Sequence, residues 1–109
     1  LLIVVLALAL VSGCAYQAKG SRLDGAPVLP PSPFAKLIYA VPTDGAVEIG
    51  RVQAQGNNYQ KASDCDAQLL VEARKLGANA VLAIPEKGIW GSGPKCSGRA
   101  FLVEGLTPP

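Results

Sequence analysis

The stretch SDCDAQLLVEARKLGANAVLAI, residues 63–84, carries the strongest structural signals in this 109-residue chain. Ser63 or Asp64 can cap the first turn of a helix, and Gly77 stands where helices commonly end. Between them, apolar residues recur at spacings of three and four, which predicts one buried stripe: Cys65, Leu69, Ala73 and Leu76. The apolar run 79–84 that follows predicts a strand. This helix–strand unit indicates a fold that mixes α and β structure.

Further strand signals lie on both sides of this unit. Residues 36–41 and 47–55 predict two strands before the helix, and residues 99–104 predict a last strand after it. Gly50, inside the second of these strands, indicates a bulge or a close backbone approach. The order strand, strand, helix, strand, strand predicts a small α+β domain over residues 36–106, with one helix packed on a four-stranded sheet. Residues 107–109 are expected to be a short tail.

The first 13 residues contain no charged side chain, and their apolar run has the length of the hydrophobic core of an export signal. The end of this run, LVSGC at residues 10–14, resembles the bacterial lipobox, in which small residues precede a cysteine that becomes acylated. We therefore expect residues 1–13 to be a truncated lipoprotein signal peptide that is cleaved, with lipidation at Cys14. An ordinary secretory signal with a chance cysteine, or a buried strand, is the alternative.

Residues 14–35 are rich in proline: Pro27, Pro30, Pro31 and Pro33. Proline fixes φ and lacks an amide donor, so this segment is expected to be an extended tether. At ~3.1 Å per residue, residues 19–35 of this segment could hold the domain roughly 50 Å from the lipid anchor. Ala15 stands where an aspartate would indicate retention in the inner membrane. We therefore expect an outer-membrane lipoprotein whose domain faces the periplasm.

Two cysteines, Cys65 and Cys96, remain once Cys14 is assigned to the anchor. In an exported domain such a pair favours a structural disulfide. It would close a loop of about 30 residues, a constraint of roughly 3–4 kcal/mol on the chain-entropy model. A labile redox pair is one alternative. A metal site that adds Asp64 and Asp66 is another, although the chain has no C-x-x-C pair and no histidine.

The layout resembles the family of Rcs stress-sensing outer-membrane lipoproteins (RcsF). Besides Cys14 and the proline-rich segment, three short motifs carry the likeness: Ile49-Gly50-Arg51-Val52, Lys75-Leu76-Gly77-Ala78-Asn79-Ala80-Val81-Leu82 and Gly93-Pro94-Lys95-Cys96. The junction at residues 77–81 is similar also to YbjQ-like small domains of unknown function, so it marks a fold better than a function. The resemblance implies an envelope sensor that contacts outer-membrane barrel proteins and reports to inner-membrane signalling proteins. That family uses two disulfides in this domain, whereas this chain offers one pair.

Composition points away from catalysis and from nucleic acid. The net charge is only +2, with both signs interspersed, and nucleic-acid binding calls for a clustered basic footprint. The absence of histidine removes the commonest general base. No activator is evident for three serines that could act as nucleophiles: Ser63, Ser92 and Ser97. We expect a protein that is not an enzyme and uses no cofactor.

The remaining hypotheses concern binding. The first is a non-catalytic envelope lipoprotein that senses or scaffolds through protein contacts and reaches the membrane through acyl chains on Cys14. Trp90, in a glycine-rich segment, is the candidate contact residue, because exposed aromatic side chains are frequent hot spots. A Trp90 side chain folded back on the sheet is the alternative. The second hypothesis is a YbjQ-like ligand- or metal-binding envelope lipoprotein with Asp64, Asp66, Glu86 and the two thiols as candidate ligands.

Overall fold

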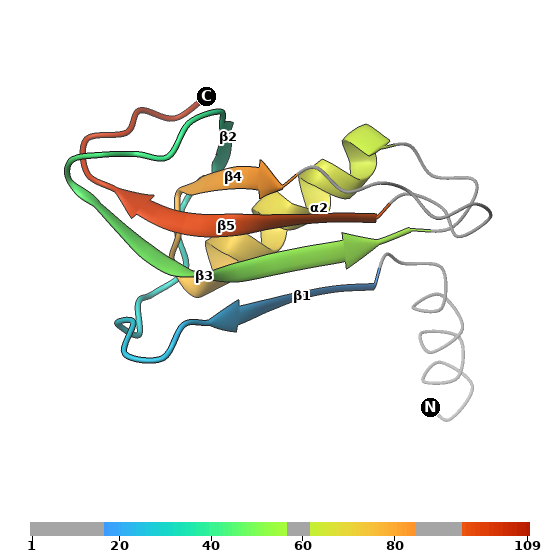
Figure 1. Ribbon diagram of the computed structural model, residues 1–109, viewed down its shortest axis with the longest axis horizontal. Coiled ribbons are helices and arrows are strands. Elements are labelled where there is room, and N and C mark those ends of the chain that lie inside the picture. Colours follow the sequence, from blue (N-terminus) through green and yellow to red (C-terminus); the bar gives the residue numbers. More distant parts are fainter. Residues whose placement is uncertain (1–16, 57–61, 85–94) are drawn as a thin grey trace, which may run out of the picture.

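A computed structural model describes residues 17–56, 62–84 and 95–109. Within these residues, one helix and five strands follow one another: β1 (Gln17–Arg22), β2 (Lys36–Ile38), β3 (Ala46–Gln55), α2 (Ala62–Leu76), β4 (Ala80–Ile84) and β5 (Lys95–Val103). The strands form one sheet in the order β1-β3-β5-β4-β2, antiparallel except for the parallel pair β2–β4, and α2 lies across one face (Figure 1). The predicted α+β domain with one helix on a sheet is confirmed, but the sheet has five strands.

The helix agrees with its predicted stripe and end, but it begins at Ala62, so Ser63 and Asp64 lie within its first turn and the predicted cap at either residue is wrong. Cys65, Leu69 and Ala73 are fully buried against the sheet, while Leu76 is partly buried at the end of the stripe. Gly77 follows with φ of 90°, the left-handed conformation that ends many helices. Burial of one helix stripe against the sheet forms the core, whose other members come from the strands and their flanks: Ala35, Ile49, Val52, Ala54, Ala78, Val81 and Ala100.

Gly50 lies at an irregularity in the β3–β5 ladder. The pairing register shifts between Glu48 and Gly50, so the chain bulges at Ile49, whose side chain is fully buried in the core. A Cβ at Gly50 would stand 2.3 Å from the carbonyl oxygen of Ser21 in β1. Both the bulge and the close backbone approach expected at this glycine are confirmed.

The fifth strand comes from the segment expected to be a tether. β1 pairs with β3 along its whole length, from Gln17 opposite Gln55 to Arg22 opposite Gly50. The residues of β1 that face the helix are Ala18, Gly20 and Arg22, so no large apolar residue in β1 signals a strand. The boundary predicted at residue 36 is therefore corrected, because the domain already includes Gln17.

Residues 23–35, which we call the strap, connect β1 at one edge of the sheet to β2 at the other and pass the carboxyl end of α2. Two hydrogen bonds tie the strap to the helix: the Ser32 amide donates to the Arg74 carbonyl at 2.9 Å, and Arg74 Nε donates to the Ser32 carbonyl at 3.1 Å. Ser32 and Ala35 are buried. The proline-rich segment is thus packed on the domain and does not extend away from it.

Two strand boundaries after β1 differ from their predictions by more than one residue. β2 ends at Ile38, where its pairing with β4 ends at Leu82. β5 begins at Lys95 and not at Arg99, and its first half pairs with the end of β3. A Cβ at Gly98 would stand 2.6 Å from Val81 Cγ1, so glycine lets β4 and β5 lie close together where the sequence gives no apolar signal.

Candidate functional site

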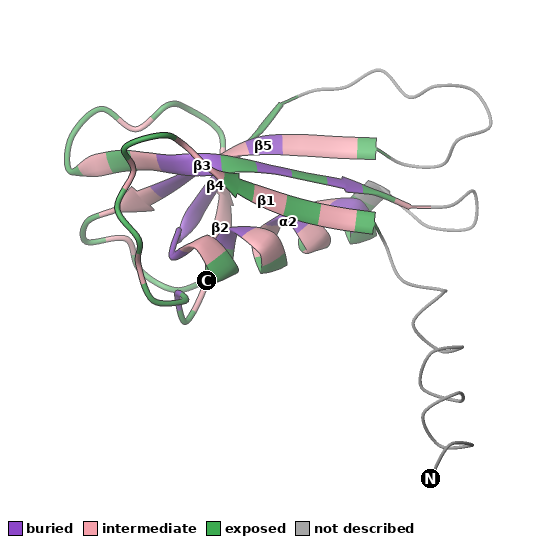
Figure 2. Ribbon diagram, turned by 90° about the horizontal axis from the view of Figure 1, so that it is seen from below, coloured by how far each residue is buried: buried purple, intermediate pink, exposed green. Residues whose placement is uncertain are grey.

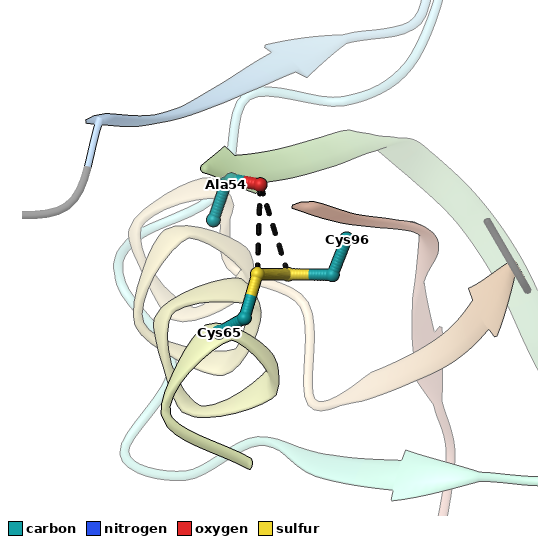
Figure 3. The surroundings of a disulfide bond; sticks show 3 residues. All are labelled: Ala54, Cys65 and Cys96. Carbon is teal, nitrogen blue, oxygen red and sulfur yellow. Dashed lines mark hydrogen bonds between the residues drawn. A yellow bond between two sulfur atoms is a disulfide. The ribbon is translucent and has the colours of Figure 1, made fainter. Parts of the chain in front are cut away.

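A disulfide joins the first turns of α2 to the beginning of β5 (Figure 3). The Cα atoms of Cys65 and Cys96 lie 6.1 Å apart, and the two residues are 31 positions apart in the sequence. Cys65 is buried and Cys96 is partly exposed. The Ala54 carbonyl oxygen of β3 lies 3.5 Å from Cys65 Sγ and 3.8 Å from Cys96 Sγ. Since sulfur atoms in a disulfide carry no proton, these are packing contacts: the bond links α2 to β5 and packs against β3.

The metal-site alternative needs free thiols beside carboxylates. Cys65 and Cys96 are bonded to each other, and within residues 17–56, 62–84 and 95–109 no three side chains of His, Cys, Asp or Glu gather as metal ligands. Asp64 is exposed on the first turn of α2, and Asp66 is half-buried. The arrangement therefore favours a cross-link between elements over a ligand set.

Several residues singled out from the sequence lie outside the described residues. These are the predicted lipidation site Cys14, the predicted contact residue Trp90, and the candidate ligand Glu86. Ser92 lies outside them too, whereas Ser63 is exposed at the start of α2 and Ser97 is half-buried on β5. Of the predicted site residues, the structure brings together Cys65 and Cys96.

A second feature was not foreseen: one face of the sheet is polar and cationic. α2 covers only one side of the β1–β3–β5 strands (Figure 2). The registers place alternate residues of these strands on the other side, which we call the open face. Its cross-strand rows run from β1 through β3 to β5: Gln17, Gln55 and Lys95; Lys19, Gln53 and Ser97; Ser21, Arg51 and Arg99.

The open face of these three strands has four cations and one carboxylate. Arg99 donates a hydrogen bond from Nε to Glu48 and lies over the Phe101 ring, 5.1 Å from its centroid. The hydrogen bond to Glu48 raises the pKa of Arg99 above its usual value. Lys19, Arg51 and Lys95 are exposed and have no carboxylate partner within the described part of the chain. These three charges are therefore available to an anionic partner.

Two shallow hollows lie on this face and share Lys19 and Gln53. One, of about 380 Å³, also involves Gln17, Gln55 and Lys95. The other, of about 350 Å³, has further lining from Ser21, Arg51, Ile84 and Ser97. Both have amide and cationic groups in their lining, and the second also has hydroxyl groups; all of these donate hydrogen bonds to anionic oxygen atoms. The face can thus hold phosphate-like or carboxylate groups at its surface.

Sequence reasoning missed this cluster because the cations are far apart along the chain. Lys19, Arg51 and Lys95 are separated by dozens of residues of mixed charge, and no basic run marks them. The available signal was the alternation within each segment, where polar residues occupy every second position. This alternation predicts a shared face only when the neighbouring strands are known, and the sequence of β1 gives no apolar strand signal.

Comparisons with protein-family models, with characterised proteins and with solved structures found no match to this chain. Within the described residues, no helix has the length and apolar character needed to cross a membrane. The features that bear on function are therefore the disulfide, the open face and the sequence that precedes β1.

Proposed function

We propose that this protein is an exported bacterial lipoprotein, anchored through Cys14, whose disulfide-braced domain binds a partner at the membrane without catalysing a reaction. The observation that carries the proposal is the pairing of Cys65 with Cys96 in a chain that also has a lipobox-like sequence. Disulfides persist in oxidising compartments such as the periplasm and are rare in the cytosol. The pairing therefore supports export independently of the first 13 residues.

The position of β1 sharpens the proposal. Cys14 stands three positions before Gln17, the first residue of β1. Three residues span at most about 10 Å, so acyl chains on Cys14 would hold the domain directly at the membrane surface. Partners would then lie in or on that same membrane. An outer-membrane barrel protein, the partner class of the RcsF-like hypothesis, would satisfy this condition.

Mass spectrometry of the protein made in a bacterium with its complete export signal tests the anchor. We expect the mature amino-terminal peptide to begin at Cys14 and to carry a thioether-linked diacylglycerol, with a further amide-linked acyl chain where the host adds one. Cys14→Ser is the control and should carry none of these groups. An unmodified Cys14 in the native protein would refute the proposal.

Crosslinking tests the partner class. A photo-reactive group at Trp90 in intact cells should recover a specific membrane protein if the domain scaffolds or senses by contact. A group at Lys75, which is exposed on α2 and pairs with Glu72 at 2.8 Å, provides the comparison. Recovery of the same abundant proteins from both positions would contradict a specific contact at Trp90.

A further inference from the structure

Three strand ends meet at the end of the sheet where β1 begins, three positions after Cys14 in the sequence. β1 begins there at Gln17, β3 ends there at Gln55 and β5 begins there at Lys95, and the three residues are neighbours across the sheet (Figure 1). The hollow of about 380 Å³ involves the same three residues. Only a short length of chain would therefore separate a group attached at Cys14 from the cations of the open face.

We propose that the open face, through Lys19, Arg51 and Lys95, docks on the anionic phospholipid headgroups of the membrane that holds the acyl chains of Cys14. This inference rests on the proposed function, because it requires an anchor at Cys14. It adds an orientation: the open face turns toward the lipid, and α2 turns away from it.

Charge complementarity supports a membrane surface as the partner of the open face. Lys19, Arg51 and Lys95 are exposed cations, and the one carboxylate on the open face of β1, β3 and β5 is engaged by Arg99. The carboxylates of the described residues otherwise lie on α2 or in turns: Asp24, Asp44, Asp64, Asp66, Glu72 and Glu104. A negative membrane surface would attract the open face and repel the acidic first turn of α2.

The polar character of the face favours adsorption over insertion. Gln17 and Gln53 offer amide donors, and the exposed side chains of β1 and β3 on this face include no large apolar residue. Such a surface gains little from entering hydrocarbon, but it can donate hydrogen bonds to phosphate oxygen atoms in the headgroup layer. Each lysine or arginine near an anionic surface strengthens binding about five-fold, so three cations supply roughly 100-fold.

Lysine footprinting of the acylated protein tests this orientation. The purified lipoprotein is reconstituted in vesicles of phosphatidylcholine, or of phosphatidylcholine mixed with phosphatidylglycerol, and is treated with an amine-reactive reagent. Mass spectrometry then reports the labelling rate of each lysine. We expect Lys19 and Lys95 to react about five-fold or more slowly on the anionic vesicles, since each contact with the anionic surface is worth about that factor. Lys75, on α2, should react equally on both.

Two manipulations refine the test. Arg51→Gln leaves both reporter lysines in place and should reduce their protection, and high salt should reduce it as well because it screens the attraction. Equal reactivity of Lys19 and Lys95 on the two kinds of vesicle would overturn the docking, as would protection of Lys75 in their place. The mass of the amino-terminal peptide, read in the same experiment, separates this failure from a failure of acylation itself.

Discussion

The side-chain amide of Asn79 takes the place of a missing strand residue beside β5. β4 begins at Ala80, opposite Phe101, so the ladder would stop before it reached Val103. Instead Asn79 Nδ2 donates to the Val103 carbonyl at 2.9 Å, and the Val103 amide donates to Asn79 Oδ1 at 2.8 Å. The main chain of Asn79 also bonds Phe101 and Lys36. One buried polar residue thus joins β2, β4 and β5.

Replacing Asn79 should therefore destabilise the domain. Asn79→Leu removes two hydrogen bonds and leaves the Val103 amide and carbonyl without these partners, so we expect a loss of about 2–3 kcal/mol in the free energy of unfolding. Urea denaturation of the oxidised protein measures it. Gln53→Leu, on the exposed open face, is the control and should change stability by no more than about 0.5 kcal/mol. A similar small change for Asn79→Leu would contradict the structural role given to this side chain.

At the scale of elements, the sequence predicts β1 and the strap least well. Hydrophobic periodicity detects a strand only when one face presents large apolar residues. β1 presents Ala18 and Gly20 to the helix, because the neighbouring Leu76 already fills the space: its Cδ1 would lie 3.1 Å from a Cβ at Gly20. The prolines of the strap predict an extended chain, but they do not reveal that this chain crosses the end of α2.

Gly77 provides a test of the contact between strap and helix. A Cβ at Gly77 would stand 2.5 Å from the Cβ of Leu29 and 2.9 Å from the Pro30 carbonyl oxygen. Gly77→Ala therefore combines the strain of a left-handed residue, about 1–2 kcal/mol, with displacement of the strap. We expect a total loss above about 3 kcal/mol in the free energy of unfolding, and faster proteolysis within the strap.

Gly105→Ala is the matched control for this substitution. Its φ of 77° is also left-handed, but nothing lies within 4 Å of the position of the new Cβ. This variant should lose only the backbone strain of about 1–2 kcal/mol. Equal losses for the two variants would mean that the strap contributes nothing to the stability of the helix end.

For the molecule as a whole, the sequence predicts the features that depend on residues close together in the chain. The helix, with its stripe and its final glycine, follows from spacings of three and four residues, and Cys65 and Cys96 are the two cysteines that follow the lipobox-like sequence. The open face could not be predicted from such local patterns. Lys19, Arg51 and Lys95 share a surface only because β1 and β5 both pair with β3, and long-range pairing leaves little trace in local sequence.

The stability of the whole domain should depend on its one cross-link. A domain of this size buries too little surface to be more than marginally stable. The Cys65–Cys96 bond spans 31 positions, so the chain-entropy model assigns it about 3–4 kcal/mol. Reducing the native protein should lower the free energy of unfolding by that amount in urea titrations.

Reduction leaves both sulfur atoms in place, and a free Cys65 thiol can donate to the Ala54 carbonyl, so the loss reports the constraint and not a cavity. The double variant Cys65→Ala/Cys96→Ala adds the cost of lost packing at the buried Cys65 and should be less stable than the reduced protein. If reduction cost less than about 1 kcal/mol, the strands and the strap would suffice to hold the fold, and the bond would be available for redox chemistry.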